Sequence, residues 1–159
     1  MLKEMKRIKN LAAASLALLI GVGATMIPAH AADAPIWSSR RFISIAHAGG
    51  DLESPHSTLY AMKKAVAAGA DVLELDLRFS SDNVLMIQHD ETVDRTTADT
   101  GPASGFTAAE LGAMDNAYRF IPNCWRCNGL PDGDYTLRGV RTGATTPPDG
   151  FTPDDFGIP

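Results

Sequence analysis

Two acidic residues and a histidine flank a short turn in the middle of this chain. Glu74 and Asp76 alternate with leucines, and His89 follows after the polar pair Asp82-Asn83. If Asp82 and Asn83 form a two-residue hairpin turn, residues whose numbers sum to 165 face each other, and Asp76 lies opposite His89. Side chains two apart on a strand share a face, and opposed Cβ atoms lie about 5 Å apart. We therefore expect all three side chains to converge on one patch.

Such a patch indicates a functional site rather than a requirement of folding alone. Unpaired charges are costly to bury, so a strand under no functional constraint rarely gathers two carboxylates and an imidazole on one side. A bound cation explains the grouping, because carboxylate oxygens are the ligands that hard divalent cations prefer.

The elements that position this patch follow a strand, helix, strand order. Residues 41–46 form a β-branched and apolar run that ends at His47, before Gly49-Gly50. A helix begins after Ser57 or Thr58 and stops at Gly69, and its expected apolar stripe comprises Leu59, Met62, Ala65 and Val66. A strand over 72–79 completes a right-handed βαβ unit with a parallel strand pair. A histidine at the carboxyl end of a strand fits an α/β barrel.

Beyond this unit the pattern becomes irregular. The six residues between Leu77 and Val84 are too few for the crossover helix that parallel strands need, so we expect the hairpin to project above the barrel rim. Thr107 and Glu110 have the spacing of a capping box, which predicts a short helix to about Met114. From Asn116 onward Gly, Pro and aromatic residues occur without a sustained period, which is typical of an ordered insertion or lid.

The first 31 residues predict a secretory signal peptide. An apolar run and the small-residue triplet Ala29-His30-Ala31 follow a basic start made by Lys3, Lys6, Arg7 and Lys9. Residues 32–40 are then a linker and 41–159 a domain. We expect export to the periplasm or the extracellular space, without stable membrane insertion after cleavage; an uncleaved membrane anchor is the alternative.

Charge and cysteine content narrow the functional classes. The leader carries a net charge of +3, so its removal changes the formal net charge from −5 to about −8, which argues against nucleic-acid binding. Cys124 and Cys127 are the chain's two cysteines, and in an oxidising compartment their spacing favours a local disulfide. A zinc site would need two further ligands.

Several motifs occur in the order of the glycerophosphodiester phosphodiesterase family, which this chain resembles over about 43–114. They are His47-Ala48-Gly49-Gly50, Ser54-Pro55-His56-Ser57-Thr58, Glu74-Leu75-Asp76, His89-Asp90, Asp94-Arg95-Thr96-Thr97 and Gly101. The resemblance implies that Glu74 and Asp76 bind a divalent cation, Mg²⁺ or Ca²⁺, while His47 and His89 act as acid and base. It also implies a TIM-type (β/α)8 barrel with an insertion after the third strand, within about 96–155.

Two positions depart from the family's pattern. Ala48 stands in place of the usual arginine after the first histidine, and His56-Ser57 in place of the usual Glu-Asn. Arg78, Arg95 or another cation is expected to contact phosphate instead, and Arg95 is the residue we select. The alternative for Arg95 is a structural role as the anchor of its loop. Arg138 and Arg141 either form a cationic flap over substrate or, as the default for loop arginines, are exposed to solvent.

The resemblance implies hydrolysis of small-molecule glycerophosphodiesters to glycerol 3-phosphate and an alcohol. Family members continue beyond an Ile-Pro like Ile158-Pro159 into a helix with a third metal carboxylate, so we expect an incomplete, N-terminal part of the barrel. A complete barrel needs about 250 residues, whereas 128 remain after the leader. The alternatives are a related barrel phospholipase or sphingomyelinase, and a non-catalytic secreted binding protein with a decayed site.

Overall fold

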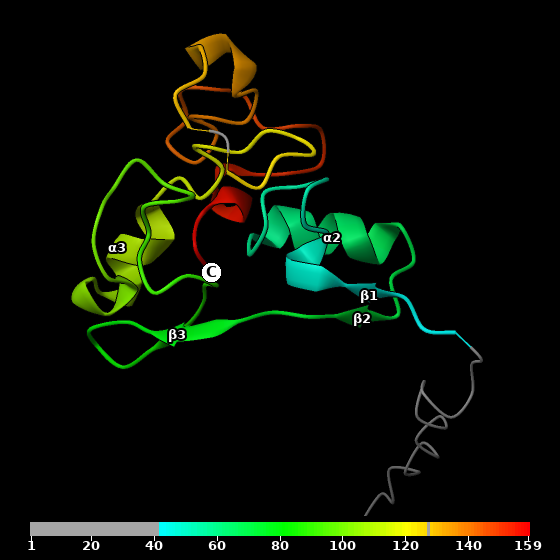
Figure 1. Ribbon diagram of the computed structural model, residues 1–159, viewed down its shortest axis with the longest axis horizontal. Helices are drawn as coiled ribbons and strands as arrows, with labels where there is room; N and C mark the ends of the chain where they lie inside the picture. The colour runs from blue at the N-terminus through cyan, green and yellow to red at the C-terminus, as the bar shows by residue number, and fades with distance from the viewer. Residues whose placement is uncertain (1–41, 127) are drawn as a thin grey trace, which may run out of the picture. The chain divides into compact units, whose positions relative to one another are not determined.

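The computed structural model describes residues 42–126 and 128–159, all within the unit Ala34–Pro159 (Figure 1). The predicted signal peptide over 1–31 and linker over 32–40 lie outside the described residues, as do Arg41 and Cys127. Within the described ranges, none of the helices has the length and apolar character needed to cross a membrane.

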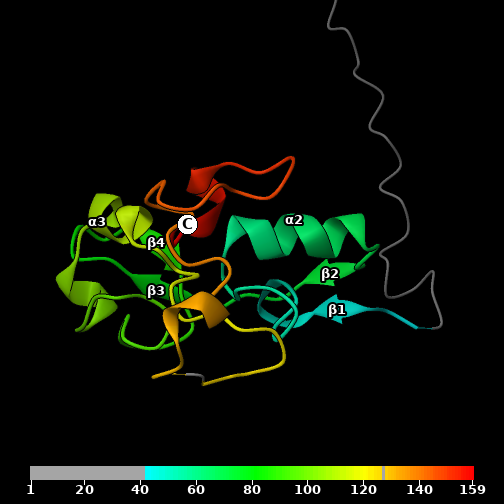
Figure 2. The same cartoon turned by 90° about the horizontal axis from the view of Figure 1, so that it is seen from above.

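The predicted strand, helix, strand unit is present and its strands are parallel. Strand β1 (Ile45–Ala46) pairs with β2 (Val72–Leu73), so that Ile45 lies opposite Val72. Helix α2 (Leu59–Ala67) connects them and packs on one side of the pair (Figures 1 and 2). The carboxyl ends of both strands therefore lie next to each other.

Helix α2 begins where the sequence predicts. The Thr58 side chain caps the helix by accepting a hydrogen bond from the Ala61 N–H at 3.1 Å. The buried face matches only half of the predicted stripe. Met62 and Ala65 are buried, but Leu59 is 38% exposed and Val66 is 60% exposed. The buried residues of α2 are Tyr60, Ala61, Met62 and Ala65.

A contact from far along the chain sets this rotation of α2. The Tyr60 ring stacks on Phe156 with centroids 4.7 Å apart, and it meets Phe151 edge-on at 4.5 Å. Because aromatic burial contributes more than burial of a valine, the side of α2 that carries Tyr60 faces inward. The helical period of the apolar residues does not by itself predict which side of α2 is buried.

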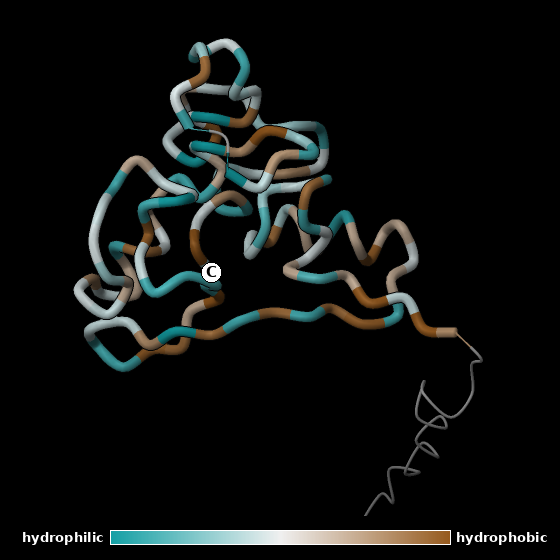
Figure 3. The backbone as a smooth tube through the Cα atoms, viewed as in Figure 1, coloured by the Kyte–Doolittle hydropathy of each residue, from teal (hydrophilic) through white to brown (hydrophobic). Residues whose placement is uncertain are grey.

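The segment 72–79 was expected to form one strand, and the structure divides it between two sheets. After β2 the chain runs on to β3 (Leu77–Phe79), which pairs antiparallel with β4 (Leu85–Ile87) (Figure 1). Hydrophobic residues recur along this path (Figure 3). Several of them are exposed, among them Leu77 at 48% and Phe79 at 59%.

The predicted hairpin register was wrong by one residue. Leu77 pairs with Ile87 and Phe79 with Leu85, so facing residues sum to 164 rather than 165. The Gln88 N–H donates to the Asp76 carbonyl at 3.0 Å, which places Gln88, not His89, opposite Asp76. A slip of one residue moves side chains to the other face of a strand, so the hairpin does not bring His89 onto the Asp76 face.

A three-residue turn causes the slip. Asn83 has a φ of 62°, and the Ser80 N–H donates to the Val84 carbonyl at 2.9 Å, so the turn comprises Ser81, Asp82 and Asn83. Asp82 favours this longer turn because its Oδ1 accepts from the Ser80 hydroxyl at 2.6 Å and from the Ala108 N–H at 2.9 Å. These hydrogen bonds, led by the Ser80 hydroxyl, also lower the pKa of the Asp82 carboxyl.

The predicted capping box is confirmed at helix α3 (Ala108–Ala113). The Thr107 N–H donates to Glu110 Oε2 at 2.8 Å, and the Glu110 N–H donates to the Thr107 hydroxyl at 3.3 Å. The remaining short helices are the 3₁₀ turns η1 (His47–Gly49), η2 (Ala103–Gly105), η3 (Asp132–Asp134) and η4 (Pro153–Phe156).

Two apolar clusters form the core of the described part. One comprises Met86, Val93, Ala103, Leu111, Met114 and Ile158, and the other comprises Tyr60, Ala117, Val140 and Phe156. Both include residues from the end of the chain, which lies against strand β4: the Ile87 N–H donates to the Pro159 carbonyl at 2.7 Å. The irregular segment is therefore part of the core.

Arg138 and Arg141 were expected either to cover substrate or to be solvent-exposed, and both expectations were wrong. Their side chains are 19% and 22% exposed. Arg138 lies over the Tyr135 ring at 3.8 Å and donates to the Tyr118 carbonyl at 2.8 Å. Arg141 donates to the Gly112 carbonyl at 2.7 Å, so both arginines tie loops to the rest of the fold.

Gly157 provides a test of the contact between the chain end and α3. A Cβ atom at Gly157 would lie 2.3 Å from the Gly112 carbonyl oxygen, so Gly157→Ala should destabilise the protein by about 1–3 kcal/mol. Gly133→Ala is the matched control, because a Cβ there meets no atom within 4 Å, and it should change stability by less than about 0.5 kcal/mol. Urea denaturation of both variants measures the difference, and equal stabilities would contradict the packing described.

Candidate active site

His47 lies where the carboxyl ends of β1 and β2 meet. Its Nε2 is 3.9 Å from Glu74 Oε2, and its Nδ1 is 3.5 Å from Asp51 Oδ2. The His47 side chain is 61% exposed, so it can reach a ligand from solvent. The parallel pairing of β1 with β2 produces this contact, since it places residues 47 and 74 at the same edge of the sheet.

Glu74 is held by the loop that follows β1. Its Oε2 accepts the Ala48 N–H at 3.0 Å, and its own N–H donates to the Ala46 carbonyl at 3.0 Å. Ala48 is buried and has a φ of 48°, in the left-handed region. At this position, where the family usually has arginine, the chain therefore uses a backbone donor to orient Glu74.

His89 is held by the next residue in the sequence. Its Nδ1 lies 2.6 Å from Asp90 Oδ1, and the other Asp90 oxygen accepts from Arg95 Nε at 2.5 Å. Burial raises the pKa of the Asp90 carboxyl, but the hydrogen bonds from Arg95 and His89 outweigh it and lower the pKa overall. Because Asp90 is anionic and accepts, the His89 Nδ1 is the donor, which leaves Nε2 for chemistry.

Arg95, the predicted phosphate contact, is engaged within the protein. Its side chain is 10% exposed, its Nε is bonded to Asp90, and its guanidinium lies 4.1 Å from the centroid of the Trp125 ring. The Arg95 Nη2 atom is buried without a hydrogen-bond partner among the described residues. This nitrogen therefore remains available as a donor to a ligand.

His56 and Trp125 also belong to the site, and sequence reasoning did not select them. Their rings are stacked at 5.4 Å with an interplanar angle of 23°, and the His56 and His89 rings lie edge to face at 6.3 Å. Burial, followed by the charge of Arg95, lowers the pKa of His56 to about 3, so this imidazole is neutral near pH 7. The replacement of the family's usual glutamate by His56 was the sequence signal that could have identified His56 as a residue of the site.

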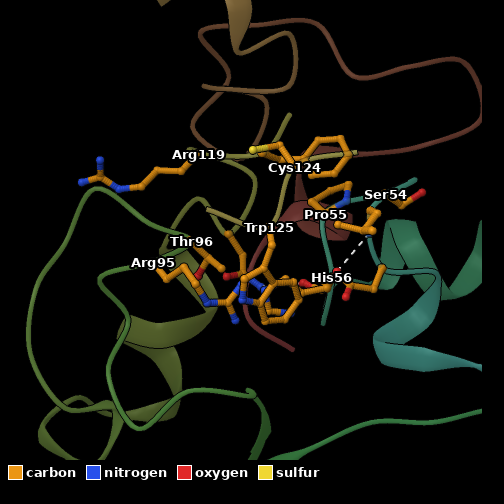
Figure 4. A pocket seen from close by; sticks show the side chains of 12 residues that line it. Ser54, Pro55, His56, Arg95, Thr96, Arg119, Cys124 and Trp125 are labelled. Carbon is orange, nitrogen blue, oxygen red and sulfur yellow. Dashed lines mark hydrogen bonds between the residues drawn. The ribbon is translucent and has the colours of Figure 1, made fainter. Parts of the chain in front are cut away.

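A small cavity of about 30 Å³ lies among these residues (Figure 4). It is lined by Asp51, Leu52, Ser54, Pro55, His56, Arg95, Thr96, Asn116, Arg119, Phe120, Cys124 and Trp125. Figure 4 shows Arg95, Trp125 and His56 gathered together, whereas the Arg119 guanidinium points away from them. The cavity has room for roughly one or two water molecules, so it does not hold a whole phosphodiester.

The predicted metal ligands fit a hard cation in their chemistry but do not form a closed cage. Glu74 and Asp76 both supply carboxylate oxygens, which suit Mg²⁺ or Ca²⁺. Across 42–126 and 128–159, no three or more His, Cys, Asp or Glu side chains gather closely enough to hold a metal ion. A cation bound to this pair would take its remaining ligands from water and substrate oxygens.

The structure thus brings together His47 with Glu74, and His89 with His56. His56 lies beside His89, one of the two predicted acid–base residues. Cys124 is disulfide-bonded, and its predicted partner, Cys127, lies outside the described residues.

Comparison with known proteins identifies the family. Residues 47–145 match the Glycerophosphoryl diester phosphodiesterase family. The chain belongs to this family. The matched range begins at His47 and includes Glu74, Asp76, His89 and Arg95.

Named relatives cover the same region. The chain is 42% identical over 76 residues to a glycerophosphodiester phosphodiesterase of Caldanaerobacter subterraneus, covering 48% of this chain and 31% of the relative. It is 40% identical over 77 residues to glycerophosphodiester phosphodiesterase 1 of Homo sapiens, covering 48% of this chain and 23% of the relative. The chain therefore spans less than a third of the length of these curated relatives.

A solved structure gives the fold. The glycerophosphoryl diester phosphodiesterase domain of an uncharacterized protein from Mycobacterium tuberculosis superposes with a TM-score of 0.54 and 25% identity. The match covers 74% of this chain and 36% of that one. This likeness confirms the predicted α/β barrel fold class, of which the chain spans about a third.

The depressed pKa of His56 predicts a loss of stability in acid. The unfolded chain binds a proton at the ordinary value of 6.5, whereas the folded state does so at about 3, so acidification in this window favours unfolding. Between about pH 7 and 5, the wild type should lose about 2 kcal/mol more than His56→Gln. Urea denaturation at both pH values tests this, and parallel losses in the two proteins would contradict a buried neutral His56.

Proposed function

We propose that this chain acts in the hydrolysis of glycerophosphodiesters to glycerol 3-phosphate and an alcohol. The observation that carries the proposal is the family match over 47–145, which includes both histidines and both carboxylates of the predicted site. The geometry supports it, because His47 lies beside Glu74 and His89 is oriented by Asp90.

The two histidines supply proton transfer. Cleavage of a phosphodiester requires removal of a proton from the nucleophile, which is water or a neighbouring hydroxyl of the substrate, and donation of one to the leaving alkoxide. His89 exchanges its proton through Nε2, since its Nδ1 is held by Asp90. His47 is the second group, and its exposed ring stands next to Glu74 at the edge of the β1–β2 pair.

A divalent cation, Mg²⁺ or Ca²⁺, belongs to this proposal. The family generally depends on such an ion. Glu74 and Asp76 are the side chains that would hold it, and the bound ion would neutralise charge on the phosphoryl oxygens. The Ala48 N–H keeps Glu74 oriented at 3.0 Å for this role.

Arg95 is proposed to contribute one donor to the substrate. Its Nη2 has no hydrogen-bond partner among the described residues, while its Nε remains on Asp90. The substrate phosphate would thus be contacted by an arginine from the loop after His89, in the absence of an arginine at position 48.

We also propose that the chain is exported, on the basis of its basic start, apolar run and Ala29-His30-Ala31 triplet. N-terminal sequencing of the protein recovered from a secreting host tests this. We expect the mature chain to begin at Ala32, and recovery of the intact leader on the cell-associated protein would contradict cleavage.

Replacing His89 tests the catalytic role. His89→Ala should lower the rate of glycerol 3-phosphate release by about 10²-fold or more, since a positioned acid or base contributes that much. Release is measured with a coupled assay on a glycerophosphodiester, in Mg²⁺ or Ca²⁺ and after chelation by EDTA. Chelation should abolish release in the wild type.

Val66→Ala is the matched control, because Val66 is 60% exposed on α2. It should retain the wild-type rate. Full activity in His89→Ala would remove His89 from the mechanism. Activity that persists in EDTA would contradict the cation, and release of a phosphorylated head group in place of glycerol 3-phosphate would indicate a different phosphodiesterase class.

A further inference from the structure

Trp125, from the irregular segment, contacts three residues of the candidate active site. Its ring centroid is 4.1 Å from the Arg95 guanidinium carbon, 5.4 Å from the His56 ring and 5.7 Å from the His89 ring. The family motifs that we used to select candidate residues do not include Trp125. Its position raises the question of what an indole contributes next to His89.

The backbone before Trp125 is fixed to the loop that carries His56. The Asn123 N–H donates to the Leu52 carbonyl at 2.7 Å, and the Cys124 N–H donates to the Ile121 carbonyl at 3.2 Å. Asn123 has a φ of 61°, which forms this tight turn. Cys124, the residue before Trp125, is also disulfide-bonded.

The neighbours of Trp125 are polar, unlike those of an aromatic residue in a hydrophobic core. The ring lines the small cavity described above, and four buried polar atoms of other lining residues have no hydrogen-bond partner within the described part of the chain. They are His56 Nε2, Arg95 Nη2, Thr96 Oγ1 and Asn116 Oδ1. Filling of an apolar core therefore does not account for the place of Trp125.

His89 needs a second contact to be fixed in orientation. The bond from Nδ1 to Asp90 holds one corner of the imidazole, but rotation about that bond still changes the direction of Nε2. The Trp125 ring stands almost perpendicular to the His89 ring, at 83°, and within the range of favourable edge-to-face contacts. Asp90 therefore fixes the position of the His89 Nδ1, and Trp125 fixes the plane of the His89 ring.

We propose that Trp125 is a positioning residue for His89: it holds the imidazole plane so that Nδ1 stays on Asp90 and Nε2 is presented to the scissile phosphodiester. The catalytic part of this statement rests on the proposed function, whereas the orientation of the ring does not. Arg95 connects Asp90 with Trp125, the two residues that orient His89, since it binds Asp90 through Nε and lies against the Trp125 ring.

The orientation is tested without any assay of activity. Long-range ¹H–¹⁵N spectra of the ring nitrogens, recorded on the full chain at about pH 8, report which nitrogen of His89 carries the proton. In the wild type and in Trp125→Phe, which keeps an aromatic ring, we expect a single tautomer protonated at Nδ1. In Trp125→Ala, the signal should move toward the mixture of tautomers seen for free imidazole.

Trp125→Leu is the second variant, because it retains apolar bulk without an aromatic ring and reports the effect if the alanine variant does not fold. Leu130→Ala is the matched control, since Leu130 is 42% exposed in the same irregular segment, and it should leave the His89 tautomer unchanged. A single Nδ1-protonated tautomer in every folded variant that lacks the ring would overturn the proposal, because Asp90 alone would then suffice.

Kinetics give the second readout. Loss of orientation should lower kcat for glycerophosphodiester hydrolysis by about 10- to 100-fold in Trp125→Leu while KM changes less than about 2-fold, and Trp125→Phe should restore most of the rate. A change confined to KM would overturn the positioning role. If the wild type shows no hydrolysis at all, the proposed function fails, and the tautomer spectra still decide whether Trp125 orients His89.

Discussion

The candidate active site depends on the Asp90 carboxylate. One of its oxygens accepts from His89 and the other from Arg95, so a single anion orients a predicted acid–base group and neutralises a nearly buried guanidinium. Arg95 in turn lies against Trp125, and Trp125 stacks on His56. Without Asp90, the Arg95 guanidinium would have no counter-ion in a site that is mostly shielded from water. This loss would cost a substantial amount of folding free energy.

Buried polar groups hold the irregular segment in place of regular secondary structure. Asp115 is 6% exposed and accepts from the Gly139 N–H at 2.6 Å, while the side-chain amide of Asn116 donates to the carbonyls of His56 and Ser57 at 3.3 Å. Burial raises the pKa of the Asp115 carboxyl, and the bonds from Gly139 and Ala117 oppose that rise. These hydrogen bonds hold the loop in one conformation, which is what a residue in the position of Trp125 requires.

The path of the chain between two small sheets separates the two histidines. Residues after β2 leave the parallel pair that carries His47 and enter the antiparallel hairpin that leads to His89. Glu74 lies at the first sheet, beside His47, while the three-residue turn rotates the hairpin so that Gln88 faces Asp76. His56, from the loop between β1 and α2, lies beside His89 and so brings a residue that precedes α2 to the second part of the site.

The sequence by itself determined the local elements whose causes lie within a few residues. The Thr58 cap, the capping box of Thr107 with Glu110, and the βαβ unit that brings His47 to Glu74 all follow from short-range patterns and strand order. The hairpin register was not predicted, because the three-residue turn is favoured both by the local bond from the Ser80 hydroxyl to Asp82 and by a bond to Asp82 from the distant Ala108 N–H. The buried face of α2 and the places of His56, Trp125, Arg138 and Arg141 were likewise decided by contacts between segments far apart in the chain. Such contacts leave no periodic signal in the sequence, since burial, ring stacking and ion pairing select among local conformations only when the whole chain is folded.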